Sequence, residues 1–146
     1  MKLQTVDNAS FFREVESILS ENLKVIFHVK GGSMRPFIQE GDAVQIAPLS
    51  SGRLRCGDIV LAHTDFGVLL HRVVSIRKEK IGLMGDANRR LERTTTDRII
   101  GILDAAWRGE RDLKINFFHM RMLALFWYVL RPLRGHLLRV YERYKK

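Results

Sequence analysis

The stretch from Gly57 to Arg77 reads GDIVLAHTDFGVLLHRVVSIR, with two apolar runs on either side of the tripeptide Asp65-Phe66-Gly67. Runs rich in Val, Ile and Leu that flank a short turn with glycine are typical of a β-hairpin. We therefore predict strands over residues 58–64 and 67–77, joined by that turn.

Further strands are expected around this hairpin, because apolar runs continue on both sides of it and Lys78-Glu79-Lys80 is a second turn signal. Residues 48–57 between them form a polar, basic loop. Closely spaced strands without intervening helices favour an antiparallel or mixed sheet that coils into a barrel, so the fold class is mainly β. The additional strands are predicted over residues 24–30, 42–47, 80–85 and 98–106.

Both ends of the chain have helical patterns. Apolar side chains recur at helical spacing in residues 8–22, which predicts an amphipathic helix. Residues 115–130 are strongly apolar, Pro132 interrupts the pattern, and a second helix is expected over residues 133–144. These last two helices are rich in arginine, and together they form a basic, apolar tail.

Composition limits the class of protein. A chain of 146 residues with 46% hydrophobic residues is long and apolar enough for one domain with its own core, which excludes a disordered protein. The formal net charge of +9 indicates a polyanionic neighbour. Charge alone leaves open whether this is a membrane surface, a nucleic acid or an acidic substrate.

Cysteine and histidine usage argues against a metal site. Cys56 is the only cysteine, and the five histidines show no close ligand spacing, so we expect no metal and no cofactor. Residues 1–8 are polar and no apolar signal segment follows them. The longest uninterrupted apolar run, residues 122–130, is shorter than the roughly 20 residues that cross a bilayer.

A candidate nucleophile lies in the sequence Gly-Gly-Ser-Met-Arg-Pro at residues 31–36. Glycine allows a tight backbone that approaches a substrate closely, and proline stiffens the turn. Backbone N–H groups of such a turn are suited to stabilise an oxyanion at Ser33. We expect Gly32, Met34 and Pro36 to bind substrate around it. The alternative is an ordinary polar turn before a strand.

A candidate base and candidate acids follow downstream. His71 lies in the predicted strand 67–77, where alternation puts His71, Val73 and Ser75 on one face and Arg72, Val74 and Ile76 on the other. A neutral imidazole is a suitable base for a serine hydroxyl, although a lone histidine is more often a structural residue. The acids that could orient it are Asp86, Glu92 and Asp97, while Asp42 and Asp58 are expected only to cap their own turns.

The order of these motifs resembles the signal peptidase I and LexA-type serine peptidase superfamily. The resemblance rests on short boxes spread over roughly residues 29–103, each of them weak alone and specific as an ordered set. The boxes are Gly31-Gly32-Ser33-Met34-Arg35-Pro36, Gly41-Asp42-Ala43-Val44, Gly57-Asp58-Ile59-Val60, His71-Arg72-Val73-Val74, Gly85-Asp86-Ala87-Asn88 and Ile100-Gly101.

The resemblance implies coiled antiparallel sheets and peptide-bond hydrolysis by Ser33 on a substrate bound as an extended strand. Most bacterial relatives have a lysine base where this chain has His71, which is similar to the endoplasmic-reticulum and archaeal type of signal peptidase. That type adds an acid, and both Asp86 and Glu92 match its positions. Gly31 stands where some relatives have a serine hydroxyl donor, so backbone groups would form the oxyanion hole.

Two further departures narrow the function. Signal peptidases carry an N-terminal membrane anchor, which we do not find here. LexA-type relatives carry a DNA-binding unit and a cleavable bond upstream of the serine, and residues 1–28 provide neither, so a self-cleaving repressor is not expected. The Cys56-Gly57 pair lies downstream of Ser33, so it does not match the cleavable bond of the LexA-type relatives.

The expected protein is therefore a serine endopeptidase that cleaves a leader or pro-peptide. We expect a catalytic domain over residues 1–106 and a basic helical extension over residues 107–146. The extension suits either an anionic membrane surface or packing on the domain, so a cytoplasmic or peripheral membrane location is expected. The alternatives are a non-catalytic peptide-binding module of the same fold and a nucleic-acid binder. No aromatic-basic motif supports the latter, so no nucleic-acid partner is expected.

Overall fold

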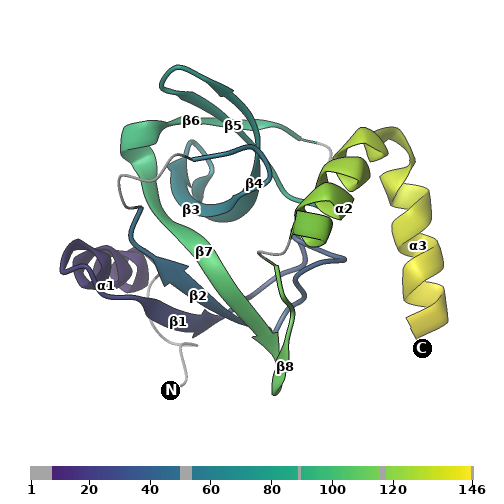
Figure 1. Ribbon diagram of the computed structural model, residues 1–146, viewed down its shortest axis with the longest axis horizontal. Helices are drawn as coiled ribbons and strands as arrows, with labels where there is room; N and C mark the ends of the chain where they lie inside the picture. The colour runs from purple at the N-terminus through teal and green to yellow at the C-terminus, as the bar shows by residue number, and fades with distance from the viewer. Residues whose placement is uncertain (1–7, 50–53, 89, 116–117, 146) are drawn as a thin grey trace.

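The computed structural model describes residues 8–49, 54–88, 90–115 and 118–145. A helix near the N-terminus, α1 (Asn8–Ser20), precedes the sheet, and two helices, α2 (Phe118–Val129) and α3 (Arg134–Lys145), follow it (Figure 1). The strands between them are β1 (Val25–His28), β2 (Ala43–Ala47), β3 (Ile59–Thr64), β4 (Gly67–Arg77), β5 (Lys80–Met84), β6 (Glu92–Thr95), β7 (Ile99–Arg108) and β8 (Arg111–Asp112). Two 3₁₀ turns, η2 (Thr96–Arg98) and η3 (Arg131–Leu133), complete the described elements.

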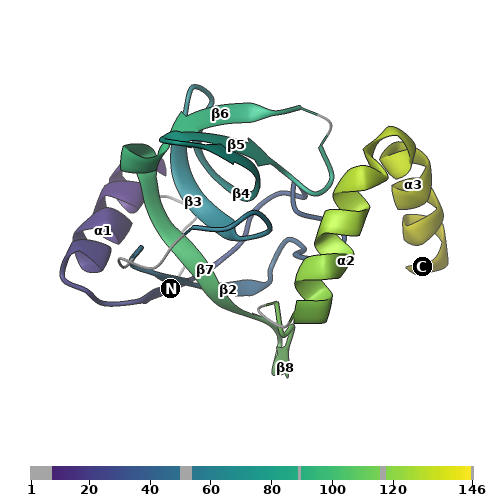
Figure 2. The ribbon, with the colours of Figure 1, turned by 45° about the horizontal axis from the view of Figure 1, so that its top comes forward.

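These strands form a single antiparallel sheet in the order β1-β2-β7-β3-β4-β5-β6, with β8 paired to β7. The sheet curls into a half-barrel, and Figure 2 shows β4 and β5 bending over β3. The predicted fold class, a mainly β protein with a coiled antiparallel sheet, an N-terminal helix and C-terminal helices, is confirmed. The long strand β7 connects the two halves because it pairs with both β2 and β3.

The core lies in two clusters, which explains why β3 is buried along nearly its whole length. Ile59 and Leu61 belong to a cluster that α1 covers with Val15 and Leu19. The next residues along the strand, Val60 and Ala62, point into a second cluster within the curl. Its other buried members are Val73, Ile81 and Leu83. A strand buried on both faces reads as a continuous apolar run, as the sequence of β3 does.

The alternation predicted along residues 67–77 is wrong beyond Val73. The pairing of β4 with β5 shifts register between Val73 and Ser75, so one extra residue is accommodated there. As a result Val73 and Ile76 pack into the same cluster, although strict alternation puts them on opposite faces. A bulge depends on how two strands pair, and one strand's sequence does not show it.

The C-terminal helices lie on the side of the sheet opposite α1 (Figures 1 and 2). Their bounds agree with the predicted helices within a few residues, and the 3₁₀ turn η3 contains Pro132 between them. Within the part of the chain that the structure describes, no helix is long and apolar enough to cross a membrane.

Candidate active site

Ser33 lies on the turn that joins β1 to β2. Gly31 enters this turn with a φ of +82°, a conformation that favours glycine. The carbonyl of Ser33 accepts a hydrogen bond from the N–H of Ala87 at 2.9 Å. The next side chain, Met34, is buried in the core. The turn is therefore fixed from both directions while Ser33 itself stays half-buried at the surface.

His71 lies on β4 and is almost fully enclosed, with 2% of the residue exposed. Its Nδ1 atom forms a hydrogen bond of 3.2 Å with Oε2 of Glu92 on β6. Its Nε2 atom faces Gly85, because a methyl group added at Gly85 would lie 3.0 Å from this nitrogen. The same methyl group would lie 2.6 Å from the Ser33 carbonyl oxygen. The small residue Gly85 therefore lies between the Ser33 carbonyl oxygen and the His71 Nε2 atom, close to both.

Ser33 and His71 are both described residues, and no hydrogen bond joins the serine hydroxyl to the imidazole in this structure. Their proximity rests on the shared neighbour Gly85 and on the Ala87 N–H that holds the Ser33 carbonyl. A residue with a side chain at position 85 would collide with both groups. The sequence motif Gly-Asp-Ala-Asn is therefore a close-approach turn between the two.

The three candidate acids occupy different places. Asp86 binds the guanidinium of Arg72 through both carboxylate oxygens, at 2.8 and 2.7 Å. Asp97 lies exposed in η2, where its carboxylate accepts a hydrogen bond from the Thr95 hydroxyl. Of the three, Glu92 is the acid in hydrogen-bond contact with His71.

The electrostatics of His71 reflect this surrounding. Burial is the largest influence and lowers the pKa of His71 below its ordinary value of 6.5. The nearby charge and hydrogen bond of Glu92, and the charge of Asp86, act in the opposite direction and raise this pKa. The net result is a neutral imidazole near pH 7, which is the form that accepts a proton.

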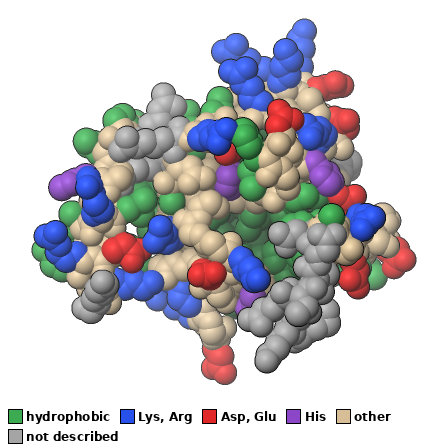
Figure 3. Space-filling view, turned by 180° about the vertical axis from the view of Figure 1, so that it is seen from behind, with side chains coloured by type: hydrophobic (Ala, Val, Ile, Leu, Met, Phe, Trp, Pro, Cys, Tyr) green, Lys and Arg blue, Asp and Glu red, His purple; other side chains and the backbone are tan. Residues whose placement is uncertain are grey.

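An apolar pocket of about 250 Å³ opens beside Ser33. Of the residues expected to bind substrate, Met34 lines it together with Ser33. Gly32 instead accepts two hydrogen bonds from Arg35, and Pro36 follows a cis peptide bond in the same turn. Most of the lining is apolar and comes from α1, β1, β3 and β4, namely Phe11, Phe12, Phe27, Leu61, Val68 and Leu70. Seen from the side opposite to Figure 1, hydrophobic side chains gather in a hollow of the surface (Figure 3).

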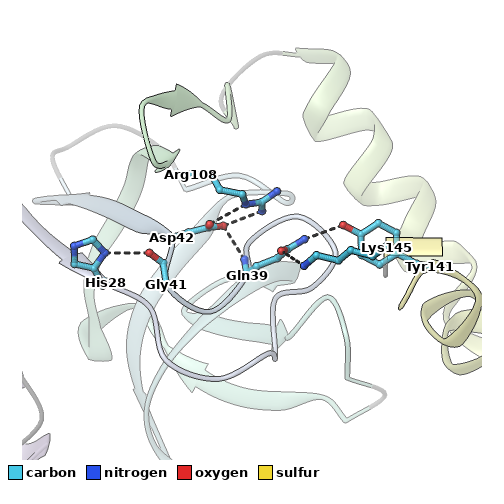
Figure 4. Close-up of polar contacts among 7 residues, drawn as sticks. All are labelled: His28, Gln39, Gly41, Asp42, Arg108, Tyr141 and Lys145. Carbon is cyan, nitrogen blue, oxygen red and sulfur yellow. Dashed lines mark hydrogen bonds and ion pairs between the residues drawn. The ribbon is translucent and has the colours of Figure 1, made fainter. Parts of the chain in front are cut away.

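The turn that carries Ser33 is supported farther along by an ion pair between the buried carboxylate of Asp42 and the partly exposed guanidinium of Arg108. Asp42 accepts hydrogen bonds from the Gln39 N–H and, through both oxygens, from Arg108 on β7 (Figure 4). These hydrogen bonds raise the pKa of Arg108. The expectation that Asp42 only caps its own turn is therefore wrong. Asp58 does cap its turn, by accepting the Arg55 N–H.

The C-terminal helices contact both turns of the site. The side chain of Gln39 binds the Tyr141 hydroxyl at 2.8 Å and the Lys145 ammonium at 2.6 Å (Figure 4). Arg35 forms an ion pair with Glu142 at 2.9 Å. On the other turn, the carbonyl of Asp86 accepts a hydrogen bond from the Trp127 indole.

Sequence reasoning missed Arg72 and Arg108 as supports of the site. The signal for Arg72 was its place inside an apolar strand, since a buried arginine needs a carboxylate partner. For Arg108 no comparable signal exists, because its partner Asp42 is 66 residues away in sequence. Among the described residues no three His, Cys, Asp or Glu side chains lie close enough to hold a metal ion together.

Two comparisons with known proteins bear on this geometry. A search of curated proteins finds no match to the chain. A family described as Peptidase S24-like matches residues 4–103, which include Ser33, His71, Asp86 and Glu92 and most of the curled sheet. The match covers well over half of the 146 residues. The chain therefore belongs to the Peptidase S24-like family.

Proposed function

We propose that this protein is a serine endopeptidase in which Ser33 is the nucleophile and His71 the general base. Membership of the Peptidase S24-like family supports the serine peptidase class. The observation that carries the residue assignment is the convergence at Gly85, where the Ser33 carbonyl and the His71 Nε2 atom meet from two sides. Catalytic hydrogen bonds often tighten only once substrate is bound, so the serine hydroxyl has to turn toward Nε2 in the reactive complex.

The proposed reaction follows the acyl-enzyme route. His71 accepts the hydroxyl proton while Ser33 attacks the scissile carbonyl, and the imidazolium then donates this proton to the leaving amine. The bond between the peptide carbonyl and its nitrogen breaks, which leaves an ester on Ser33. Water, deprotonated by His71, hydrolyses the ester. The backbone N–H of Ser33 is our candidate for stabilising the oxyanion.

We assign the orienting role to Glu92 and a supporting role to Asp86. Glu92 contacts Nδ1 of His71, so it can hold the tautomer in which Nε2 is free to accept a proton. Asp86 is held by Arg72 and acts on His71 only through its charge. A histidine base in place of the lysine of most bacterial relatives fits this arrangement, since a carboxylate supports an imidazolium directly.

We further propose how the chain is divided and what it binds. Residues 1–106 would form the catalytic domain and residues 107–146 an extension that packs against it. The substrate would be an extended leader or pro-peptide with its side chains near the cut in the apolar pocket beside Ser33. A peripheral membrane location is proposed because the extension is basic and exposes apolar side chains.

The assignment is tested by incubating the full chain with a fluorophosphonate probe and with a peptide library, and by reading both by mass spectrometry. Labelling of Ser33 and cutting of peptides are expected, and both are lost in Ser33→Ala and strongly reduced in His71→Ala. Ser75→Ala and His63→Gln are matched controls, because Ser75 is exposed on β4 and His63, on the neighbouring strand β3, is half-exposed and paired with Glu16. Equal cutting by Ser33→Ala and the parent would disprove the proposal.

A non-catalytic peptide-binding module is the second candidate, since a curled sheet with an apolar pocket can hold an extended peptide without cutting it. It predicts saturable peptide binding with neither probe labelling nor turnover. The burial of His71 against Glu92 favours the peptidase, because a binding module needs no such pair.

A further inference from the structure

Helix α2 is apolar on two faces, of which the protein uses one. The inner face packs against the sheet domain, where Ala124 is buried and the Trp127 indole donates a hydrogen bond to the Asp86 carbonyl. The outer face carries large apolar side chains that remain exposed, among them Phe126 at 60% and Val129 at 71%. Most helices of a small domain bury one apolar face and expose a polar one, so the outer face needs an explanation.

This outer face is continuous over three turns. Its members are spaced so that they lie on one side of the helix and run on into η3, where Leu133 extends the row. We refer to Met122, Leu123, Phe126, Val129 and Leu133 as the outer apolar face. Each of them is at least half exposed even though α3 is present beside α2.

The sequence of the two C-terminal helices is predominantly basic. Residues 118–145 contain six Lys or Arg and a single acid, Glu142. That acid is already paired with Arg35, so it does not offset the basic side chains at the surface. Among the described side chains, Arg139 and Arg143 are exposed on α3, and the chain as a whole carries +9. An anionic partner is therefore electrostatically favoured.

We propose that the outer apolar face of α2 and η3 inserts into the headgroup region of an anionic bilayer, with Arg139 and Arg143 of α3 on the lipid phosphates. A helix of 12 residues is about 18 Å long at 1.5 Å per residue, which suits a position in the plane of the interface. The exposed aromatic and aliphatic side chains match the apolar region of the bilayer interface, and the exposed arginines match its anionic phosphates.

The inner contacts of the helix pair remain intact in this arrangement. Trp127 on α2 and Tyr141 on α3 bind the two turns of the candidate active site through faces that do not belong to the outer apolar face. The bilayer would therefore hold the site close to the lipid surface. If the protein is the peptidase proposed above, its substrates are peptide segments that emerge from or lie on that surface, and this last step alone rests on that function.

The experiment is flotation of the purified full chain with vesicles of phosphatidylcholine, with and without phosphatidylglycerol. We expect binding to the vesicles with phosphatidylglycerol, weakened but not abolished by added salt because the apolar contribution is unscreened. The double variant Phe126→Ser/Val129→Ser is expected to lose about tenfold or more of this binding. Arg139→Gln/Arg143→Gln is expected to weaken it and to reduce its salt dependence.

Leu23→Ser/Ile26→Ser is the matched control, because Leu23, between α1 and β1, and Ile26, on β1, are apolar and similarly exposed. It should bind vesicles like the parent. Thermal melts of each variant are recorded to check that it is folded. Binding through another basic surface is the main rival. The exposed β4–β5 turn carries Arg77, Lys78 and Lys80, and Figure 3 shows basic side chains clustered at the top of the molecule.

Loss of vesicle binding in Lys78→Gln/Lys80→Gln, with full binding by Phe126→Ser/Val129→Ser, would overturn the proposal. So would failure of the parent to bind any vesicle. If sedimentation instead shows a dimer that Phe126→Ser/Val129→Ser dissociates, the face binds a second copy of the chain and the bilayer proposal is wrong. Flotation does not depend on catalysis, so the Ser33→Ala variant should bind vesicles like the parent. Failure of the peptidase assignment would therefore leave the result of this experiment unchanged.

Discussion

His71 and Glu92 are a pair whose two members come from different strands and whose burial leaves little freedom. The two side chains are 3% and 6% exposed, so water does not compete for the hydrogen bond between them. In such surroundings a carboxylate stabilises an imidazolium far more than it would in water. Both Glu92 and Asp86 are buried close to His71, so burial does not distinguish their roles. The distinction is that Glu92 forms a hydrogen bond with His71, whereas Asp86 binds Arg72.

Replacing Glu92 with Gln tests this division. The amide keeps the shape but removes the charge that stabilises the imidazolium and fixes its tautomer, so we expect kcat to fall by about 10³-fold with KM nearly unchanged. The measurement is steady-state cleavage of a peptide substrate. Asp97→Asn serves as the control, since that acid is exposed and its carboxylate accepts a hydrogen bond from Thr95 instead of contacting His71. An equal effect of both variants would contradict the assignment.

The pH dependence follows from the lowered pKa of His71. Above pH 6.5 the imidazole is neutral in both the folded and the unfolded protein, so its protonation does not affect stability there. As pH falls below 6.5 the unfolded chain takes up the proton first, and the free energy of unfolding decreases. We expect the acid limb of kcat/KM to lie below pH 6.5 and urea melts to show a loss of stability there. This loss should shrink in His71→Asn, and an acid limb above 6.5 would contradict the expectation.

At the scale of elements, the sequence predicts what is carried by local patterns and fails where pairing decides. The hairpin of β3 and β4 was predictable because both strands are apolar and a glycine turn joins them. Strand β6 was missed because its sequence, Glu-Arg-Thr-Thr, is polar and only its pairing with β5 makes it a strand. That pairing also brings Glu92 to His71, so the choice among the acids was open from sequence.

The buried pair of Arg72 and Asp86 joins β4 to the turn after β5, and it gives the next prediction. Replacing Arg72 with Met leaves the Asp86 carboxylate buried without its fork of hydrogen bonds, and we expect a loss of about 3–5 kcal/mol in the free energy of unfolding. The double variant Arg72→Met/Asp86→Leu should regain much of this loss. Arg77→Met, exposed on the same strand, should change stability by less than about 0.5 kcal/mol. Urea unfolding measures all three.

At the scale of the whole molecule, the two ends of the chain act on the same site from opposite sides. Helix α1 contributes Phe11 and Phe12 to the pocket beside Ser33. Helices α2 and α3 contact the turns that carry Ser33 and Asp86. The sequence predicted α1 from its helical spacing and the C-terminal helices from a long apolar run interrupted at Pro132. The contacts of the C-terminal helices with the site depend on tertiary packing between segments more than 40 residues apart. The C-terminal extension is thus part of the support of the candidate site.

The contacts of α3 with Gln39 provide the test of that support. The double variant Tyr141→Phe/Lys145→Met removes both hydrogen bonds to the Gln39 side chain, and we expect a loss of only about 1–2 kcal/mol in global stability because each bond is partly solvated. The turn that follows Ser33 should nevertheless open more often. We expect faster amide exchange over residues 34–42 and a several-fold lower kcat, with exchange in β3 unchanged.

Tyr144→Phe/Arg143→Met is the control for this experiment, because both side chains are exposed on the same helix and neither forms a hydrogen bond with the Gln39 side chain. If exchange over residues 34–42 and kcat stay at parental values in Tyr141→Phe/Lys145→Met, α3 contacts the turn without restricting its motion, and the prediction is wrong. A lower kcat without faster exchange would place the effect in substrate contact instead. Faster exchange together with a lower kcat is the outcome expected of a helix that holds the Ser33 turn in its reactive shape, because a mobile turn spends less time in that geometry.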